Sequence, residues 1–420
     1  MALRKTLTAF APFVRQPGPR ALLAGNAISR FGDALDTVAF GWLVYRLTGS
    51  TLMMGMLYTV NALPGLIFGL AGGLLADRRP PARTFALLCA LRGALVMLIA
   101  VLALLDRCPV YMLFVFTALN STCEALGSPA AQKLPSLLLP APSLDGYLGL
   151  QQGLQTGAEL LGYAMSGFVI ALLGMGHALL VDAMTFLACA ALVLRAGRYA
   201  QAAQQAARQE ETPRSALLEG IRHIRRVPAL VILVLYEGFV NLMLAPFNAL
   251  NIVYVGTVLG RGPETVGVMG VTFMAGTLLG GLCAALLAST APRLRLTLAT
   301  LLLGTGYALL ALPPLLPGWM GLPLTLTACV LAGLGLPIAI TTAQAVALRT
   351  TPAHLRGRVL GLLLVVTYAA TPLGSAAAGV LGSLVELPAL FGACGLMVLL
   401  CALPLLLCNP LRQLDAPPAP

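Results

Sequence analysis

The stretch LMMGMLYTVNALPGLIFGLAGGLL, which runs from Leu52 to Leu75, holds no charged residue. A helix needs about 20 apolar residues to cross the hydrocarbon core of a bilayer, so this stretch predicts a membrane-spanning helix. Similar stretches recur along the chain, six before a long polar interruption and six after it. We expect spans at residues 21–46, 52–75, 84–105, 109–131, 145–173, 176–195, 229–254, 264–288, 295–316, 320–346, 358–385 and 388–408.

The composition agrees with a membrane protein. Hydrophobic residues make up 59% of the 420 residues and charged residues only 10%, whereas soluble domains carry about 25% charged residues. Apolar surface in such excess needs lipid as its solvent. The 44 glycines and 29 prolines fit that environment, because neighbouring helices satisfy the backbone groups that these residues leave free. The sequence therefore predicts an all-α membrane protein with twelve transmembrane helices.

Basic residues gather on one side of the predicted spans. If both termini lie in the cytoplasm, 21 of the 26 Lys and Arg residues fall in inner segments, and only Arg46, Arg107 and Arg261 lie at outer ends. Arg30 and Arg92 lie inside helices. Cytoplasmic loops of membrane proteins carry such an excess, which accounts for the net charge of +11 without a nucleic-acid partner. We expect a multi-pass protein of the plasma (inner) membrane.

The two halves of the chain resemble each other when one is shifted by 212 residues. The shift aligns PAPSLDGYLGL at Pro140–Leu150 with PAHLRGRVLGL at Pro352–Leu362, and two shorter matches fall at the same offset. Two similar halves related by an axis along the membrane normal are a transporter architecture, with the substrate site between them near the midplane. We therefore expect two pseudo-symmetric six-helix bundles.

These observations divide the chain into five parts. We expect a cytoplasmic tail at 1–20 without a cleavable signal peptide, bundles at 21–196 and 228–409, a linker at 197–227, and a tail at 410–420. The linker ends in LLEGIRHIRR, which alternates apolar and basic residues and predicts a short amphipathic helix at the membrane surface. A plain connector is the alternative. The nine cysteines form no CxxC motif or Cys/His cluster, so neither a disulfide framework nor a metal site is predicted.

The segment GGLLADRRPPAR at Gly72–Arg83 joins the second and third predicted helices. It resembles the signature loop of the major facilitator superfamily, which reads Gly, three residues, Asp-Arg and then a basic cluster; Gly73, Asp77 and Arg78 match. The later glycine and basic pair are replaced by PPA, with Arg83 one step beyond. The resemblance implies a gate in which Gly73 permits close helix approach and Asp77 pairs with an arginine. A generic positive-inside loop is the alternative.

Other stretches resemble the exporter branch that holds macrolide efflux pumps and the enterobactin exporter. These are the first helix, GNAISRFGDALDTVAFGWLVYRLTGS, and the segments SPAAQKLPSLLLP, LLVDAMTFL, LLEGIRHIRRVPAL and RGRVLG. The resemblance implies secondary active, proton-coupled efflux of amphipathic small molecules, of drug or siderophore type, by alternating access. The equivalent loop of the second half, STAPRLR, lacks the acid, so the salt-bridged gate is not carried over there.

Six acidic residues lie in the interior of predicted spans, where an ionisable side chain is costly unless it is paired or hydrated: Asp33, Asp36, Glu124, Glu159, Asp182 and Glu237. Polar residues share one face of the fifth helix, around Gln155 and Glu159, and one face of the seventh, around Glu237 and Asn241. Such faces predict a water-filled cavity, with hydrogen bonds that merely join the helices as the alternative. We expect the proton-coupling and substrate-cavity residues among Asp36, Glu124, Gln155, Glu159, Glu237 and Asn241.

Three charged residues suggest ion pairs inside the first half. Arg30, Asp33 and Asp36 step by three residues and share a broad face of the first helix. Arg30 is expected to neutralise Asp33, and Arg92 of the third helix to pair with one of these acids, with anion binding as the alternative. Asp182, a couple of turns into the sixth helix, is expected to make only a near-surface polar contact.

Competing functions are distinguished by missing motifs. The chain has no G-x-x-x-x-G-K-[ST] sequence, so no ATP-driven pump is predicted. It has no H-E-x-x-H or D-D-x-x-D sequence, which disfavours an intramembrane lipid-modifying enzyme. A facilitator or importer of a nutrient, metal chelate or lipid stays open as the alternative transporter. We expect no catalytic residues and no cofactor, and as partners a small-molecule substrate, protons and the lipid bilayer. The oligomeric state stays open, with a monomer as one option.

Overall fold

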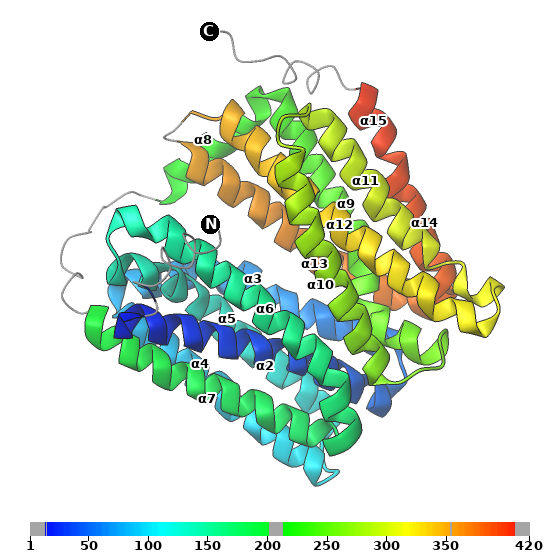
Figure 1. Cartoon of the computed structure of the whole chain (residues 1–420), viewed down its shortest axis with the longest axis horizontal. Coiled ribbons are helices and arrows are strands. Elements are labelled where there is room, and N and C mark those ends of the chain that lie inside the picture. Colours follow the sequence, from blue (N-terminus) through cyan, green and yellow to red (C-terminus); the bar gives the residue numbers. More distant parts are fainter. Residues whose placement is uncertain (1–12, 14, 201–212, 353–354, 408–420) are drawn as a thin grey trace, which may run out of the picture. The chain divides into compact units, whose positions relative to one another are not determined.

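The computed structural model describes residues 13, 15–200, 213–352 and 355–407, and these residues form helices and connections without a strand (Figure 1). In chain order the elements are α2 (Pro17–Thr48), α3 (Thr51–Arg78), α4 (Pro81–Leu104), α5 (Val110–Leu138), α6 (Ala141–Leu173), α7 (Met175–Ala200), α8 (Pro213–Arg226), α9 (Pro228–Thr257), α10 (Pro263–Leu286), α11 (Pro292–Leu309), the 3₁₀ turn η1 (Pro313–Leu315), α12 (Gly318–Thr350), α13 (Arg356–Leu384), α14 (Leu387–Leu400) and α15 (Ala402–Leu407).

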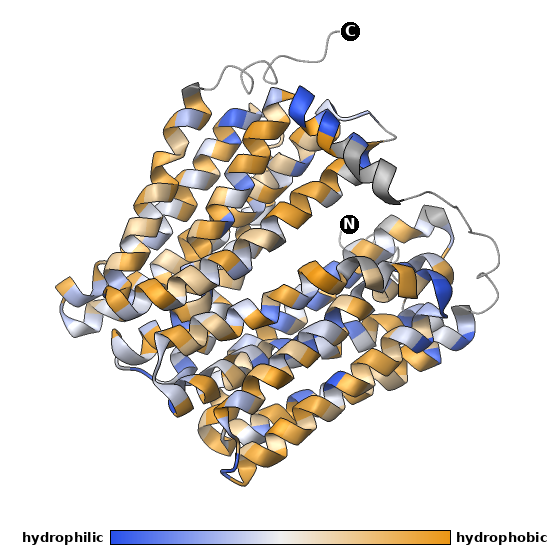
Figure 2. Cartoon of the chain, turned by 180° about the vertical axis from the view of Figure 1, so that it is seen from behind, coloured by the Kyte–Doolittle hydropathy of each residue, from blue (hydrophilic) through white to orange (hydrophobic). Residues whose placement is uncertain are grey.

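Twelve of these helical segments match the predicted spans. Ten are long and apolar enough to cross a membrane, counting α14 with α15 as one. The other two are α2, which carries several charged residues, and α11, which has 18 residues and carries two arginines in its first turn. Large apolar side chains such as Leu161, Leu286 and Leu384 are exposed, as contact with lipid requires. Figure 2 shows hydrophobic residues along most of the helices. The prediction of an all-α membrane protein with twelve long helices is confirmed.

Several helices continue past the apolar stretch that predicted them. The first was expected at 21–46 but extends from Pro17 to Thr48, and the fourth was expected at 109–131 but continues to Leu138 through two prolines. Apolar length marks only the part of a helix that lies in hydrocarbon, and the polar ends remain helical beyond it. The helices therefore place charged residues at their ends as well as inside.

The contacts divide the chain into two compact units. The first unit is Met1–Gly49 with Val60–Gln209, and the second is Ser50–Thr59 with Glu210–Pro420. Thus the beginning of α3 is grouped with the second unit. The expected tails at 1–20 and 410–420 and the middle of the expected linker fall largely outside the described residues. A helix, α8, occupies Pro213–Arg226, where the amphipathic helix was expected; its place at a membrane surface stays a prediction.

In the first unit α7 packs closely against both α4 and α2, and α2 also packs on α6. Buried side chains of α2, α4, α5, α6 and α7 form one core there, which includes Leu22, Leu134, Tyr147 and Val193. In the second unit α12 packs on α10 and α11, and α9 packs on α13. Small residues permit this: a Cβ added at Gly333 of α12 would overlap the backbone of α10. Each unit is thus built by close helix–helix contact.

Candidate functional site

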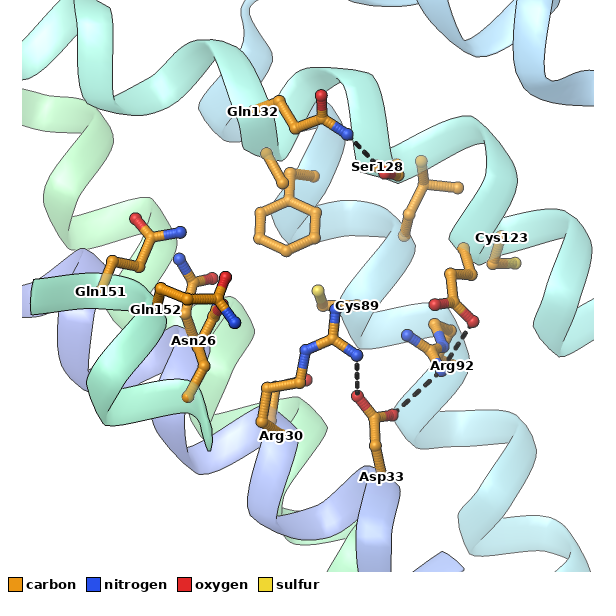
Figure 3. Close-up of a pocket in the computed structure, with 17 residues that line it drawn as sticks. Asn26, Arg30, Asp33, Cys89, Arg92, Cys123, Ser128, Gln132, Gln151 and Gln152 are labelled. Carbon is orange, nitrogen blue, oxygen red and sulfur yellow. Dashed lines mark hydrogen bonds and ion pairs between the residues drawn. The ribbon is translucent and has the colours of Figure 1, made fainter. Parts of the chain in front are cut away.

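A polar pocket of about 290 Å³ lies within the first unit, between α2, α4, α5 and α6 (Figure 3). Its walls combine charged residues, amides and a few apolar side chains. In a helical unit whose outside is apolar, such a pocket is the place where polar groups of a solute would be stabilised. The lining residues are Asn26, Ser29, Arg30, Asp33, Phe85, Leu88, Cys89, Arg92, Cys123, Glu124, Gly127, Ser128, Ala131, Gln132, Gln151, Gln152 and Gln155.

Arg92 is the centre of the charged part of this pocket. Its Nη2 lies 3.2 Å from Asp33 Oδ1 and 3.5 Å from Glu124 Oε2. Its Nε donates a hydrogen bond of 2.9 Å to Asn120 Oδ1, and its guanidinium carbon lies 4.2 Å from the ring centroid of Phe186. The Arg92 side chain is only 11% exposed. These contacts use the Nε and Nη2 donors of the guanidinium, and they come from three other helices.

The two acids differ in their exposure to solvent. Asp33 is 26% exposed and is also 3.9 Å from Arg30 Nη1, whereas Glu124 is 52% exposed. Arg30 and Asp33 are three residues apart on α2, which brings their side chains to the same face. Of the two carboxylates beside Arg92, that of Glu124 is therefore the more exposed.

Amide side chains form the other side of the pocket. Gln151, Gln152 and Gln155 come from α6, and Gln132 of α5 donates a hydrogen bond of 3.1 Å to Ser128 Oγ. Gln152 makes a long hydrogen bond of 3.4 Å to Thr156, and Gln151 Oε1 is buried without a hydrogen-bond partner in the described part of the chain. Amides both donate and accept hydrogen bonds. This wall can therefore bind uncharged polar groups without bringing further charge into the pocket.

Of the residues predicted for the cavity or its charge pairs, the structure brings Arg30, Asp33, Arg92, Glu124 and Gln155 into this pocket. Arg30 contacts Asp33 as expected from their spacing. The partner of Arg92, which the sequence left open, is both Asp33 and Glu124. Asn26, Gln132 and Gln151 were not singled out beforehand, because single amides on apolar helices carry no signal that separates a pocket wall from a helix contact.

Other predicted residues lie elsewhere. Asp36 and Glu159 are half-buried in the first unit but do not line the pocket. Glu237 and Asn241 belong to the second unit, on α9. There Asn241 Nδ2 donates hydrogen bonds of 2.9 Å to the Glu237 carbonyl and 3.4 Å to Glu237 Oε2. These are contacts within one helix, and the role of these four residues stays a prediction.

The signature-loop residues are arranged differently from the expectation. Asp77 pairs with Lys133 of α5 and not with an arginine. A Cβ added at Gly73 would meet nothing within 4 Å, whereas one added at Gly72 would lie 2.6 Å from Ala125 O. The close helix approach therefore lies at Gly72, because a shift of one residue turns the side chain by about 100° around the helix axis. Among the described residues, exposed Arg78 and Arg83 make no ion pair.

Asp182 corrects another expectation. It was expected near the surface but is 0% exposed on α7, where Thr185 Oγ1 donates a hydrogen bond of 3.2 Å to its Oδ1. Asp182 and Thr185 are three residues apart, so they share a face of the helix, and this spacing could have predicted their contact from the sequence. Within the described ranges, no group of three or more His, Cys, Asp or Glu side chains is arranged to hold a metal ion.

The known proteins to which this chain is similar include proteins named as transporters and efflux pumps. The chain is 29% identical to the multidrug efflux pump Tap of Mycolicibacterium fortuitum, over 95% of this chain and 97% of that protein. It is 22% identical to macrolide efflux protein A of Streptococcus pyogenes, over 93% and 96%. A crystal structure of a bacterial homologue of the iron transporter ferroportin in its inward-facing state shares the fold, with a TM-score of 0.72 at 17% identity over 92% of this chain and 98% of that one.

The resemblance to drug exporters that the sequence motifs indicated is thus confirmed by relatives that span almost the whole chain. A family model described as Major Facilitator Superfamily matches residues 22–368 and, in a second match, 238–419. These matches cover both units and the helices that line the pocket. The chain therefore belongs to the Major Facilitator Superfamily of membrane transporters.

Proposed function

We propose that this transporter is a secondary active exporter, which moves amphipathic small molecules out of the cell in exchange for protons by alternating access. The observation that carries the proposal is the pocket of the first unit, where Arg92 holds two carboxylates inside a set of apolar helices. Charged groups inside a membrane are costly and are kept where they bind solutes or carry protons. The efflux activity named for the relatives supports the direction of transport.

Proton coupling is proposed for the half-exposed carboxylate of the pocket. Glu124 Oε2 and Asp33 Oδ1 share one atom of Arg92, its Nη2. A proton on Glu124 removes one of these two attractions, and it leaves Arg92 bound to Asp33 alone. Solute and proton then compete for the Glu124 carboxyl group. Each weakens the binding of the other by the same factor, and this couples their movements. Asp36, Glu159 and Glu237 are the further candidates for the carboxyl group that accepts a proton.

The chemistry of the pocket also suggests the class of solute. Its two arginines face two acids, so that the charged residues balance, and the remaining polar groups are mainly amides. Such a wall favours neutral or cationic amphiphiles with groups that can form hydrogen bonds. We place the protein in the inner membrane with both termini in the cytoplasm, following the distribution of its basic residues. The two bundles at 21–196 and 228–409 then act as the two halves of the transporter.

An export assay tests this proposal. The chain is expressed in a host that lacks its own efflux pumps and screened against a panel of drugs and siderophores, and it is then reconstituted in vesicles with and without a pH gradient. We expect efflux of at least one compound, accelerated by the gradient. Uptake that needs no gradient would favour a facilitator or importer, and unchanged retention of every compound would contradict export.

Variants test which carboxyl groups of the first unit take part in proton coupling. Glu124→Gln and Glu159→Gln each remove one ionisable group with little change of shape, and we expect at least one of them to lose proton-driven efflux. Glu386→Gln is the matched control, because Glu386 is exposed between α13 and α14. If both variants in the first unit keep the full response to the pH gradient, these carboxylates are not the coupling groups.

A further inference from the structure

The carboxyl group of Asp182 lies in the contact between α7 and α2. Asp182 is 0% exposed, and a Cβ added at Gly32 of α2 would overlap both Asp182 Oδ1 and Thr185 Oγ1. The glycine thus leaves space for only these polar atoms between the two helices. No lipid or solvent separates the carboxyl group from α2. Asp182 belongs to the interior of the first unit and not to its rim.

The hydrogen bonds of Asp182 do not suit a charged carboxylate. Thr185 has one hydroxyl proton, and it is shared between the Asp182 carbonyl at 2.7 Å and Asp182 Oδ1 at 3.2 Å. Asp182 Oδ2 is buried and has no hydrogen-bond partner within the ranges that the structure describes. A buried carboxylate without donors or a cation at close range pays most of its desolvation cost uncompensated. A protonated carboxyl group avoids that cost.

The charges around Asp182 act in both directions, because the two aspartates repel a charge on it and the arginine attracts one. Asp33 and Asp36 from α2 and Arg92 from α4 are close enough to act on it electrostatically. Within the described part of the chain, the ion pairs of Arg30 and Arg92 go to Asp33 and Glu124, and none goes to Asp182 or Asp36.

The charged group around Asp182 has four acids and two arginines: Asp33, Asp36, Glu124, Asp182, Arg30 and Arg92. Full ionisation of all six would leave a net charge of −2 in a region of low dielectric. Like charges at close range do not all ionise. Asp36 is partly exposed, whereas Asp182 is fully buried. A charge is therefore least stabilised on Asp182.

We propose that Asp182 is a proton-binding site, which holds its proton while α2 and α7 are in contact and releases it when they separate. On release the O–H bond of the carboxyl group breaks, and the proton passes to water admitted between the helices. Loss of the proton leaves a charge against Gly32 that only water or a cation can stabilise. Asp33, next to Gly32, bonds Arg92, so a shift of α2 at this contact reaches the pocket.

The protonation of Asp182 stands on its own, whereas its effect on transport rests on the proposed function. Infrared spectroscopy of the purified full-length protein tests the first part, since a protonated carboxyl group has a C=O band that a carboxylate lacks. At neutral pH we expect such a band in the wild-type protein, exchanging slowly in D₂O. Absence of the band in the wild type overturns the proposal, even if no variant can be purified.

Three variants show which carboxyl group gives the C=O band. Asp182→Asn should abolish it, while Asp106→Asn should keep it, because Asp106 is an exposed loop residue with a left-handed backbone (φ 51°) that asparagine tolerates. Loss of the band in Asp36→Asn with its retention in Asp182→Asn would place the proton on Asp36 and overturn the proposal.

Transport supplies the second readout, with the lipophilic cation tetraphenylphosphonium as probe. In Asp182→Asn vesicles, the stimulation of probe efflux by a pH gradient should be lost, because an asparagine side chain cannot bind and release the proton. If wild-type vesicles do not move the probe, the failure concerns the proposed function, and the infrared band still decides the proton site. Full stimulation in Asp182→Asn would overturn its part in coupling.

Discussion

Replacing Arg92 by glutamine removes the cation that Asp33 and Glu124 share. The Arg92 side chain is 11% exposed and that of Asp33 is 26% exposed, so both charges lose much of their hydration in the folded protein. Removing one partner of a fully buried ion pair costs about 3–5 kcal/mol. Because Asp33 keeps some solvent contact and a second, longer approach from Arg30 at 3.9 Å, we expect a loss of about 2–3 kcal/mol in unfolding free energy.

A double-mutant cycle separates the two partners of Arg92. The pair with Asp33 is closer and less exposed than the pair with Glu124, at 3.2 Å against 3.5 Å and 26% against 52% exposure of the acid. We expect a coupling energy of about 1–3 kcal/mol between Arg92→Gln and Asp33→Asn. Between Arg92→Gln and Glu124→Gln we expect less than about 1 kcal/mol, since water screens the half-exposed acid.

The cycle is measured by reversible unfolding of the purified protein in mixed micelles, with the midpoint of thermal unfolding as a second observable. Arg107→Gln serves as the matched control, because Arg107 is exposed between α4 and α5. Additive effects of Arg92→Gln and Asp33→Asn would refute the reasoning, and so would a larger coupling to Glu124 than to Asp33.

Three further predictions concern glycines and the signature loop. Gly32→Ala should lower the unfolding free energy by about 1–3 kcal/mol, because its methyl group would overlap polar atoms of α7; thermal unfolding measures this. Gly72→Ala should be destabilising by a similar amount, about 1–3 kcal/mol, while Gly73→Ala is tolerated, since only Gly72 faces the backbone of α5; the reverse order would contradict the assigned helix contact. Asp77→Asn should cost less than about 1 kcal/mol in the same measurement, because the pair with Lys133 is exposed on both sides, and added salt should reduce the difference.

The loop of the second half that is equivalent to the one carrying Asp77 contains two arginines and no acid. Arg295, in the first turn of α11, is 6% exposed, and its Nε and Nη2 have no hydrogen-bond partner among the described residues. The absence of an acid in STAPRLR was evident from the sequence. The two halves therefore share their helical plan but not the charges at these loops.

The sequence by itself determined the class of this protein and the number of its helices. Stretches such as Leu52–Leu75 can be solvated only by lipid, and in lipid a helix satisfies all of its own backbone hydrogen bonds. The spacing of Arg30 and Asp33 on one helix likewise sufficed to predict their contact, because residues three apart lie on the same face.

Only the tertiary structure decided which side chains meet across helices. It placed Arg92 between Asp33 and Glu124, moved the close approach from Gly73 to Gly72, and buried Asp182 against α2. In a soluble protein an apolar face marks the side that packs, but in a membrane both the packed face and the lipid face are apolar. The rotation of each helix about its axis is therefore hard to predict from the sequence, and it is determined by the contacts between helices.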